Sequence, residues 1–234
     1  FYDARPPLAL SSSFAVDNPL PTAEIVQCVH PRPQAGGFDK GRAWRWEPLV
    51  CAKDATASDP DDPLAWRGTA GALLVHADGP YTNGVWASFG VQDMTWYQTP
   101  AVLEIVRATA ERMRRGVFLL DGGTNFYTYF ENQPAELGAR VVNTSSVPAQ
   151  IAVEAALRLG TEVFERHEWK VDLAAGSVTR VATTVAVPSQ AKDGIVAQVT
   201  ESVNGEQVDA AQHDVFDWVP DSQPQFMTVE NGTF

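Results

Sequence analysis

The chain has 234 residues, of which 44% are hydrophobic and 20% are charged, and its formal net charge is −12 at pH 7. This length suits one large domain or two small ones. The acidic balance argues against a nucleic-acid partner, because phosphate binding needs a basic face. No apolar run approaches the roughly 20 residues of a membrane span, so we expect no membrane contact.

The first 98 residues predict an extended segment followed by short strands. Residues 1–20 are rich in proline and serine and read as extended chain, and 22–30 form a plausible strand. In the next strand, 42–50, Trp44 and Trp46 alternate with Arg45 and Glu47, so the two pairs should point to opposite faces. Residues 69–77 and 84–91 follow as two more strands, which gives a tight β-meander.

The two cysteines, Cys28 and Cys51, both fall in predicted strands and are too few for a disulfide scaffold. A single bridge between neighbouring strands is one reading. We favour the other reading, two buried free thiols.

One helix is expected at residues 100–115. Thr99 can cap it, Pro100 fits the first helical position, and Gly116 fits a left-handed residue just past the end. Three arginines in the last turn suit the helix dipole. The predicted apolar stripe comprises Val102, Leu103, Val106, Ala110 and Met113.

After the helix the hydrophobic period changes to two, with turn signals every 8–14 residues, which predicts a run of antiparallel strands. Residues 151–159 could also form a helix, but alternation from Ile151 to Leu159 favours a strand. Asn204-Gly205 predicts a type I′ hairpin turn. We therefore expect a mainly β (α+β) protein: an N-terminal β-meander with one amphipathic helix, then an immunoglobulin-like antiparallel β-sandwich.

Three regions follow from this reading. Residues 1–120 form a β-rich domain with the helix, 121–222 form the sandwich, and 223–234 begin a following domain that is cut short. Gly122 and Gly123 are interpreted as the turn between the first two regions. The chain starts at Phe1 and stops at Phe234 just after an Asn-Gly turn, so we expect a piece of a longer protein.

No motif predicts catalysis, a metal or a cofactor. The histidines His30, His76, His167 and His213 lack nearby metal ligands, and no activated nucleophile is apparent. Glycosidase chemistry would need two carboxyls about 5–10 Å apart, one with a raised pKa. The carboxylates that lie near strand ends are Glu47, Asp93, Asp121 and Glu131, and nothing singles out two of them.

Aromatic residues gather in the first half of the chain. The set comprises Trp44, Trp46, Trp66, Tyr81, Trp86, Trp96 and Tyr97. These residues either form core and a domain interface, or stack on sugar rings beside Arg and Asp side chains that bind hydroxyls. The candidates for sugar or interface contact are Trp44, Trp46, Tyr81 and Trp86.

Three stretches between residues 38 and 130, "FDKGRAWRWEPLVCAKD", "WRGTAGALLVHADGPYTNGVWASFGVQD" and "RRGVFLLDGGTNFYTYF", resemble a segment of large bacterial glycoside hydrolases of clan A. There an amidotransferase-like or trimerisation-like domain ends in a strand pair and a helix. "ELGARVVNTSSVPAQIAVEAALRL" and "WKVDLAAGSVTRVATTVAVP" look like the immunoglobulin-like linker that follows. "FMTVENGTF" is similar to the hairpin that opens the catalytic (β/α)8 barrel.

This resemblance implies a non-catalytic accessory region that supports or extends the active-site cleft of a downstream catalytic domain. No catalytic residue carries over, because the barrel positions are absent from this sequence. The alternatives are a self-contained carbohydrate-binding module, with a poly- or oligosaccharide as partner, and a surface adhesion or assembly domain. The cellular location stays open; we favour an extracellular or periplasmic location over the cytoplasm.

Overall fold

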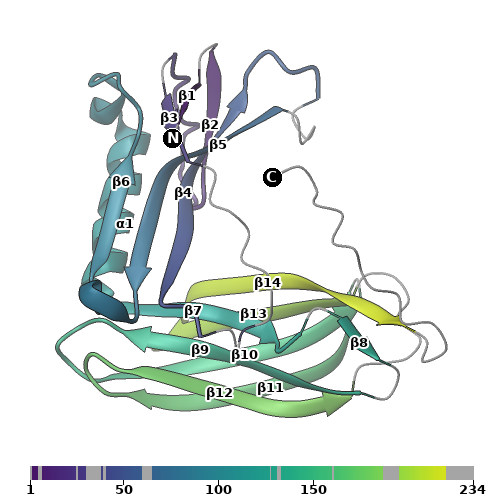
Figure 1. Cartoon of the computed structure of the whole chain (residues 1–234). Helices are drawn as coiled ribbons and strands as arrows, with labels where there is room; N and C mark the ends of the chain where they lie inside the picture. The colour runs from purple at the N-terminus through teal and green to yellow at the C-terminus, as the bar shows by residue number, and fades with distance from the viewer. Residues whose placement is uncertain are drawn as a thin grey trace. The chain divides into compact units, whose positions relative to one another are not determined.

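The structure is a computed structural model that describes residues 2–4, 7–24, 26–29, 38, 41–59, 65–126, 128–130, 133–159, 161–186 and 195–219. The chain divides into two compact units (Figure 1). The first unit comprises Phe1–Pro31, Trp44–His76 and Gly84–Gly116, and the second comprises Arg32–Ala43, Ala77–Asn83 and Val117–Phe234. The chain thus passes between units directly after the helix, four residues before the boundary expected at 120. The predicted start of a further domain at 223–234 lies outside the described residues.

The first unit contains a four-stranded antiparallel sheet in the order β2-β4-β5-β6. Its strands are β2 (Leu8–Ser12), β4 (Trp44–Asp54), β5 (Trp66–His76) and β6 (Val85–Phe89). The last three form the predicted meander. The N-terminal segment is more regular than expected: β2 forms the sheet edge, and β1 (Tyr2–Ala4) pairs with β3 (Val26–Cys28).

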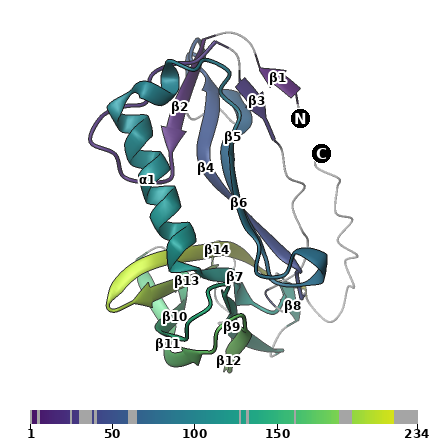
Figure 2. The ribbon, with the colours of Figure 1, turned by 90° about the vertical axis from the view of Figure 1, so that its left-hand side faces the viewer.

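The helix α1 (Pro100–Arg115) begins and ends where the sequence predicted, and it runs along one side of the sheet (Figure 2). Gly116 adopts the left-handed conformation (φ 71°), and its N–H donates to the Arg112 carbonyl. Thr99 occupies the cap position, but its hydroxyl donates to the Trp96 carbonyl at 2.9 Å instead of capping the helix.

The predicted apolar stripe of α1 is wrong in most of its members. The buried helix residues are Ala101, Val102, Ile105 and Thr109. Leu103, by contrast, is 41% exposed, and Val106 is exposed too. The helix is therefore turned about its axis relative to the expected stripe. The buried Thr109 hydroxyl is satisfied by donating to the Ile105 carbonyl at 2.8 Å.

The second unit is a sandwich-like pair of sheets, as the mainly β fold prediction required. One sheet has the order β12-β9-β7, from Val178–Ala186, Pro134–Asn143 and Val117–Thr124. The other has the order β11-β10-β13-β14-β8, from Glu162–Leu173, Ala149–Leu159, Ile195–Val203, Glu206–Val219 and Thr128–Phe130. Buried side chains from both sheets, such as Leu137 and Leu157, form a single core.

Two local predictions in this unit are confirmed. Residues 151–159 lie in the strand β10, and Ile151, Val153 and Leu157 point into the core. The turn between β13 and β14 places Asn204 at φ 52° and Gly205 at φ 82°, the pair of left-handed residues that a type I′ turn requires.

The interpretation of Gly122 and Gly123 as a turn is wrong, because both lie inside β7. A side chain at Gly122 would place its Cβ 2.8 Å from the Cβ of Val199 on β13. The glycine therefore allows the two sheets of the sandwich to approach closely, a requirement that local turn signals do not reveal.

Both cysteines are free thiols in the first unit; Cys28 is buried and Cys51 half-buried. Burial, with a smaller contribution from the neighbouring Cys51, raises the pKa of the Cys28 thiol to about 11. The preferred reading of two free thiols agrees with this arrangement, although only one is fully buried.

We expect iodoacetamide at pH 8 to modify Cys51 in the native protein about tenfold faster than Cys28, or more. At this pH a thiol with a pKa near 11 is ionised only on the order of one part in a thousand. Burial raises the pKa of the Cys51 thiol as well, but Cys51 is only half-buried and can be reached by the reagent, whereas the buried Cys28 is shielded from it. Mass spectrometry of tryptic peptides measures both rates. The folded Cys51→Ser variant should take up almost no label until denaturant is added. Rapid labelling of Cys28 in that variant would contradict the assignment of Cys28 as a buried thiol with a raised pKa.

Among the described residues, no helix is long and apolar enough to span a membrane. Nor does the described part of the chain bring three or more His, Cys, Asp or Glu side chains together as metal ligands.

Candidate functional site

Strand alternation divides the side chains of β4 between the two faces of its sheet. Trp44 and Trp46 point to one face, and Arg45 and Glu47 point to the other. Glu47 accepts a hydrogen bond from Arg112 of α1 at 2.9 Å, and Arg45 lies 3.8 Å from the same carboxylate. The charged pair therefore faces the helix, and the tryptophans occupy the opposite side of the sheet, as the sequence alternation predicted.

The strand register brings further side chains beside the two tryptophans. Trp44 is opposite His76 on β5, and Trp46 is opposite Leu74, which in turn is opposite Trp86 on β6. Directly opposed residues of antiparallel strands share a face of the sheet. We call this set the aromatic face: Trp44, Trp46, Leu74, His76 and Trp86.

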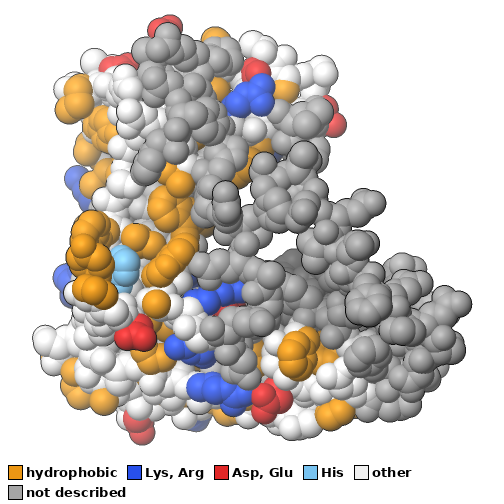
Figure 3. Space-filling view, in the orientation of Figure 1, with side chains coloured by type: hydrophobic (Ala, Val, Ile, Leu, Met, Phe, Trp, Pro, Cys, Tyr) orange, Lys and Arg blue, Asp and Glu red, His pale blue; other side chains and the backbone are white. Residues whose placement is uncertain are grey.

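Two of these indole rings are open to solvent. Trp44 is 36% exposed and Trp86 is 56% exposed, while Trp46 is half-buried. The rings of His76 and Trp86 lie 6.1 Å apart with their planes tilted by 58°. Figure 3 shows hydrophobic side chains on both sides of a histidine in the region of β4, β5 and β6. Clustered exposed aromatics of this kind are a candidate contact surface.

A small pocket of about 90 Å³ continues this face beyond Trp46. Small residues on neighbouring strands leave the space for this pocket. Among them are Ala72 and Ser88, which oppose each other in the register. Gln27 and Thr69 add polar groups to the lining. The pocket is well below the roughly 300–1,000 Å³ of small-molecule sites, so it can add polar contacts to the aromatic surface but cannot hold a ligand by itself.

The indole of Trp46 adds a donor at this place. Its Nε1 is buried and has no hydrogen-bond partner among the described residues. A buried indole N–H normally finds a partner, because leaving it unpaired costs free energy. The face therefore combines exposed rings, a small polar pocket and one donor that is available for an acceptor.

Comparison with known proteins finds only weak likenesses. No protein-family model matches the chain, and no curated protein matches its sequence. A cycloisomaltooligosaccharide glucanotransferase from Paenibacillus sp. resembles it with a TM-score of 0.34 and 19% identity, over 41% of this chain and 13% of that chain. A protein assigned as a beta-galactosidase from Bacteroides fragilis gives 0.33 and 12%, over 44% and 16%.

A beta-glucuronidase of glycoside hydrolase family 2 gives a TM-score of 0.30 and 10% identity, over 42% of this chain and 11% of that chain. These weak structural neighbours are thus carbohydrate-active enzymes, and the chain spans between 11% and 16% of their length. Likenesses at this level establish neither a family nor an activity, and matches of similar strength include proteins of other kinds.

Of the four candidate contact residues, the structure brings Trp44, Trp46 and Trp86 together. Tyr81 lies in a short 3₁₀ turn, Gly79–Tyr81, whose residues group with the second unit, and it is exposed there.

Other aromatics of the predicted cluster have structural roles. Trp96 is buried and donates from Nε1 to the Pro21 carbonyl at 3.2 Å. The Tyr97 hydroxyl donates to the Val91 carbonyl at 2.8 Å. For these two residues the core interpretation is the correct one.

Sequence reasoning missed His76, Ser88 and Gln27 as neighbours of the tryptophans. Each lies on a different strand from Trp46, and only the pairing of β4, β5 and β6 brings the first two to the same face. The available signal was the meander itself: once its register is fixed, His76 falls opposite Trp44.

Proposed function

We propose that this chain is a non-catalytic accessory region of a carbohydrate-active enzyme, and that the aromatic face of its first unit contacts carbohydrate. The observation that carries this proposal is the pair of exposed indoles, Trp44 and Trp86, on the side of the sheet opposite the helix. The glycoside hydrolase barrel of clan A that the sequence resemblance implies would lie downstream, and the amidotransferase-like origin of the first unit belongs to the same proposal.

The chemistry of the face suits a sugar chain. Exposed indole rings stack on the C–H surfaces of sugar rings, and the strands that hold Trp46 and Trp86 are about 10 Å apart, because each strand spacing is about 4.8 Å. An extended ligand could therefore lie across the strands and touch both rings. Ser88, Thr69 and Gln27 provide hydroxyl and amide groups for the sugar hydroxyls.

The environments of the candidate carboxylates support a non-catalytic role. A general acid needs a raised pKa. The pKa of Asp93 is instead lowered, first by the Thr95 hydroxyl and then by the Thr95 N–H. Glu47 is paired with Arg112, and Asp121 lies 3.2 Å from Arg42. Glu131, the fourth candidate, lies outside the described residues.

We expect Trp86→Ala and Trp44→Ala each to weaken carbohydrate binding about fivefold or more, since a lost stacking contact is worth roughly 1 kcal/mol or above. Affinity electrophoresis through gels that contain soluble β-glucan, α-glucan, xylan or galactomannan measures the effect on the 234-residue chain. Fluorescence titration with oligosaccharides released from the retarding polymer then gives the dissociation constants.

Trp66→Ala is the matched control, because Trp66 is also an exposed indole of β5 but lies at the opposite end of that strand from His76. Its binding should equal that of the unmodified chain. The proposal fails if no polysaccharide retards the chain, or if Trp86→Ala binds unchanged. Loss of several kcal/mol of folding stability in Trp86→Ala would assign this ring to the core instead.

A further inference from the structure

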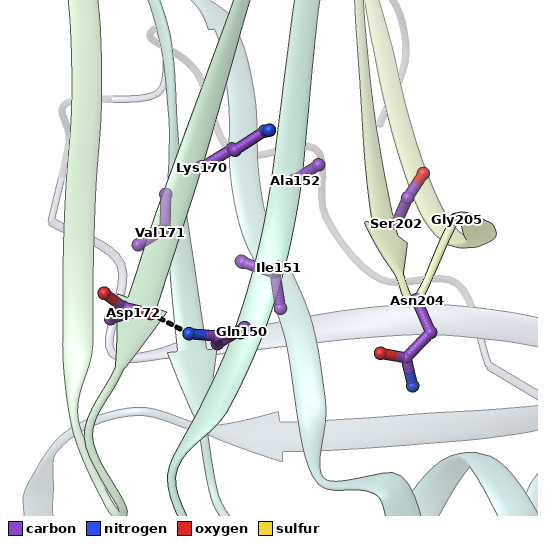
Figure 4. Close-up of a pocket in the computed structure, with 9 residues that line it drawn as sticks. All are labelled: Gln150, Ile151, Ala152, Lys170, Val171, Asp172, Ser202, Asn204 and Gly205. Atoms are coloured by element: carbon purple, nitrogen blue, oxygen red, sulfur yellow. Dashed lines mark hydrogen bonds between the residues drawn. The ribbon is translucent and has the colours of Figure 1, made fainter.

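The outer face of the five-stranded sheet in the second unit is hollowed along β10. One hollow of about 370 Å³ lies beside the β13–β14 turn, where Asn204 and Gly205 border it (Figure 4). Another of about 310 Å³ lies further along the same strands. Ser202 lines both, and so do outward-facing residues of β10. The two hollows share Ser202 in their linings, and we refer to them together as the β10 groove.

Small side chains on β10 create the floor of the groove. Along this strand Ile151, Val153 and Leu157 point into the sandwich core. The alternate residues Ala152 and Ala156 point outward, one in each hollow, and their methyl groups leave room between longer neighbours. In the register Ala152 is opposite both Lys170 and Ser202, so the floor extends across three strands.

The positive and negative side chains of the groove nearly cancel in number, and one pair of them is in direct contact. Gln150 donates to Asp172 at 2.9 Å, and Arg166 donates to Glu154 at 2.6 Å. The lining contains three basic and two acidic side chains, so it presents little net charge in a protein whose total is −12. This balance favours a neutral ligand over an anion or a cation.

Uncharged hydrogen-bonding groups make up much of the remaining lining: Gln198, Thr200, Ser202, Asn204 and Gln207. Amides and hydroxyls offer both donors and acceptors, which matches a ligand whose groups also do both. None of the residues that line the groove is aromatic. The groove is thus built for hydrogen bonding and not for stacking.

Arg158 provides an independent sign that a partner is missing. Its side chain lines the second hollow, and its Nε is buried without a hydrogen-bond partner among the described residues. A buried donor of a charged group is costly to leave unpaired, so an acceptor in the groove would remove that cost.

We propose that the β10 groove is a second binding site, which takes a neutral, hydroxyl-rich chain, that is, an oligosaccharide. Its length along β10 suits an extended ligand, and its lining suits hydroxyl groups. The site goes beyond the function proposed for the aromatic face: it lies in the other unit and rests on different residues, so either site can fail without the other.

The experiment isolates the groove by removing the exposed rings of the aromatic face. In a Trp44→Ala/Trp86→Ala background, isothermal titration with maltoheptaose, cellohexaose, xylohexaose and mannohexaose should show residual binding of at least one oligosaccharide. Ala152→Tyr, which fills the first hollow, should reduce that binding tenfold or more. Gln198→Ala, which removes an amide without adding volume, should reduce it severalfold and provides a second variant if Ala152→Tyr folds poorly.

Thr184→Tyr is the control, since it places the same ring at an exposed position of β12 in the other sheet. It should leave residual binding unchanged. Binding should also be constant between about 50 and 500 mM NaCl, because a neutral ligand has no charge for the salt to screen. The proposal is overturned if none of the four oligosaccharides binds this background, if Ala152→Tyr and Gln198→Ala both bind as tightly as it does, or if a neutral Ser/Gln/Gly decapeptide binds the groove in their place.

Discussion

Gly138→Ala should destabilise the second unit by about 3 kcal/mol or more, because the added methyl group has no space. Gly138 lies in the middle of β9, between Ala182 of β12 and Gly123 of β7. A Cβ at this position would lie 2.2 Å from the Val181 carbonyl oxygen and 2.8 Å from the Cα of Ala182. Both are backbone atoms of a paired strand, so relief requires β12 to move away from β9.

Urea unfolding followed by far-ultraviolet circular dichroism measures this loss as a lower midpoint and a lower free energy of unfolding. Gly205→Ala is the control: no atom lies within 4 Å of the place that its added methyl group would take, but its φ of 82° disfavours an L residue. It should cost only about 1–2 kcal/mol. If Gly138→Ala costs no more than Gly205→Ala, then the pairing of β9 with β12 is looser than the register indicates.

The strands of the second unit could be predicted because their signals are local. Alternation from Ile151 to Leu157 required one face of β10 to be buried, and this outweighed the helix propensity of its Ala, Glu and Leu residues. Asn204-Gly205 fixed the β13–β14 hairpin for a similar reason, since few residue pairs adopt two positive φ angles.

Close contacts between distant segments leave no such local trace. Local signals predict a turn at Gly122, because glycine after a strand often marks one. Its role depends instead on Val199, far along the chain, whose Cβ would be 2.8 Å from a side chain at this position. The β10 groove has no signal in the sequence either, since it needs the register of β10 with β11 and β13 together.

The aromatic face could be predicted only in part, because alternation shows which side chains of one strand share a face but not which strands lie beside it. Alternation within one strand was enough to place Trp44 and Trp46 together and Glu47 opposite them. The addition of Trp86 depended on β5 lying between β4 and β6, which the meander made plausible. Tyr81 is near these residues in sequence, but the turn that carries it groups with the other unit.

The helix was predicted with the correct bounds but with the wrong buried side. α1 has apolar residues on more than one side, so the periodicity alone allowed a stripe through Leu103 and Val106. The buried side instead includes Ala101, Ile105 and Thr109, spaced by four residues. Arg112 continues this row, three residues after Thr109, and its contact with Glu47 turns the row toward the sheet.

Ile105→Ala should therefore cost the first unit about 2–5 kcal/mol of folding stability, whereas Leu103→Ala should cost less than about 1 kcal/mol. Ile105 is fully buried, and its truncation leaves a cavity under the helix; Leu103 is 41% exposed, so its truncation mainly removes surface. The two variants remove similar volumes from the same helix, two residues apart, which keeps helix propensity nearly constant between them.

Intrinsic tryptophan fluorescence during urea unfolding reports mainly on the first unit, which contains five of the seven tryptophans: Trp44, Trp46, Trp66, Trp86 and Trp96. A large loss of folding stability in Ile105→Ala with a small loss in Leu103→Ala means that the row of Ala101, Ile105 and Thr109 faces the sheet. The reverse order would mean that the stripe through Leu103 and Val106 faces the sheet. In that case Arg112 could not reach Glu47, and the separation of charged and aromatic faces on β4 would lose its support from the helix.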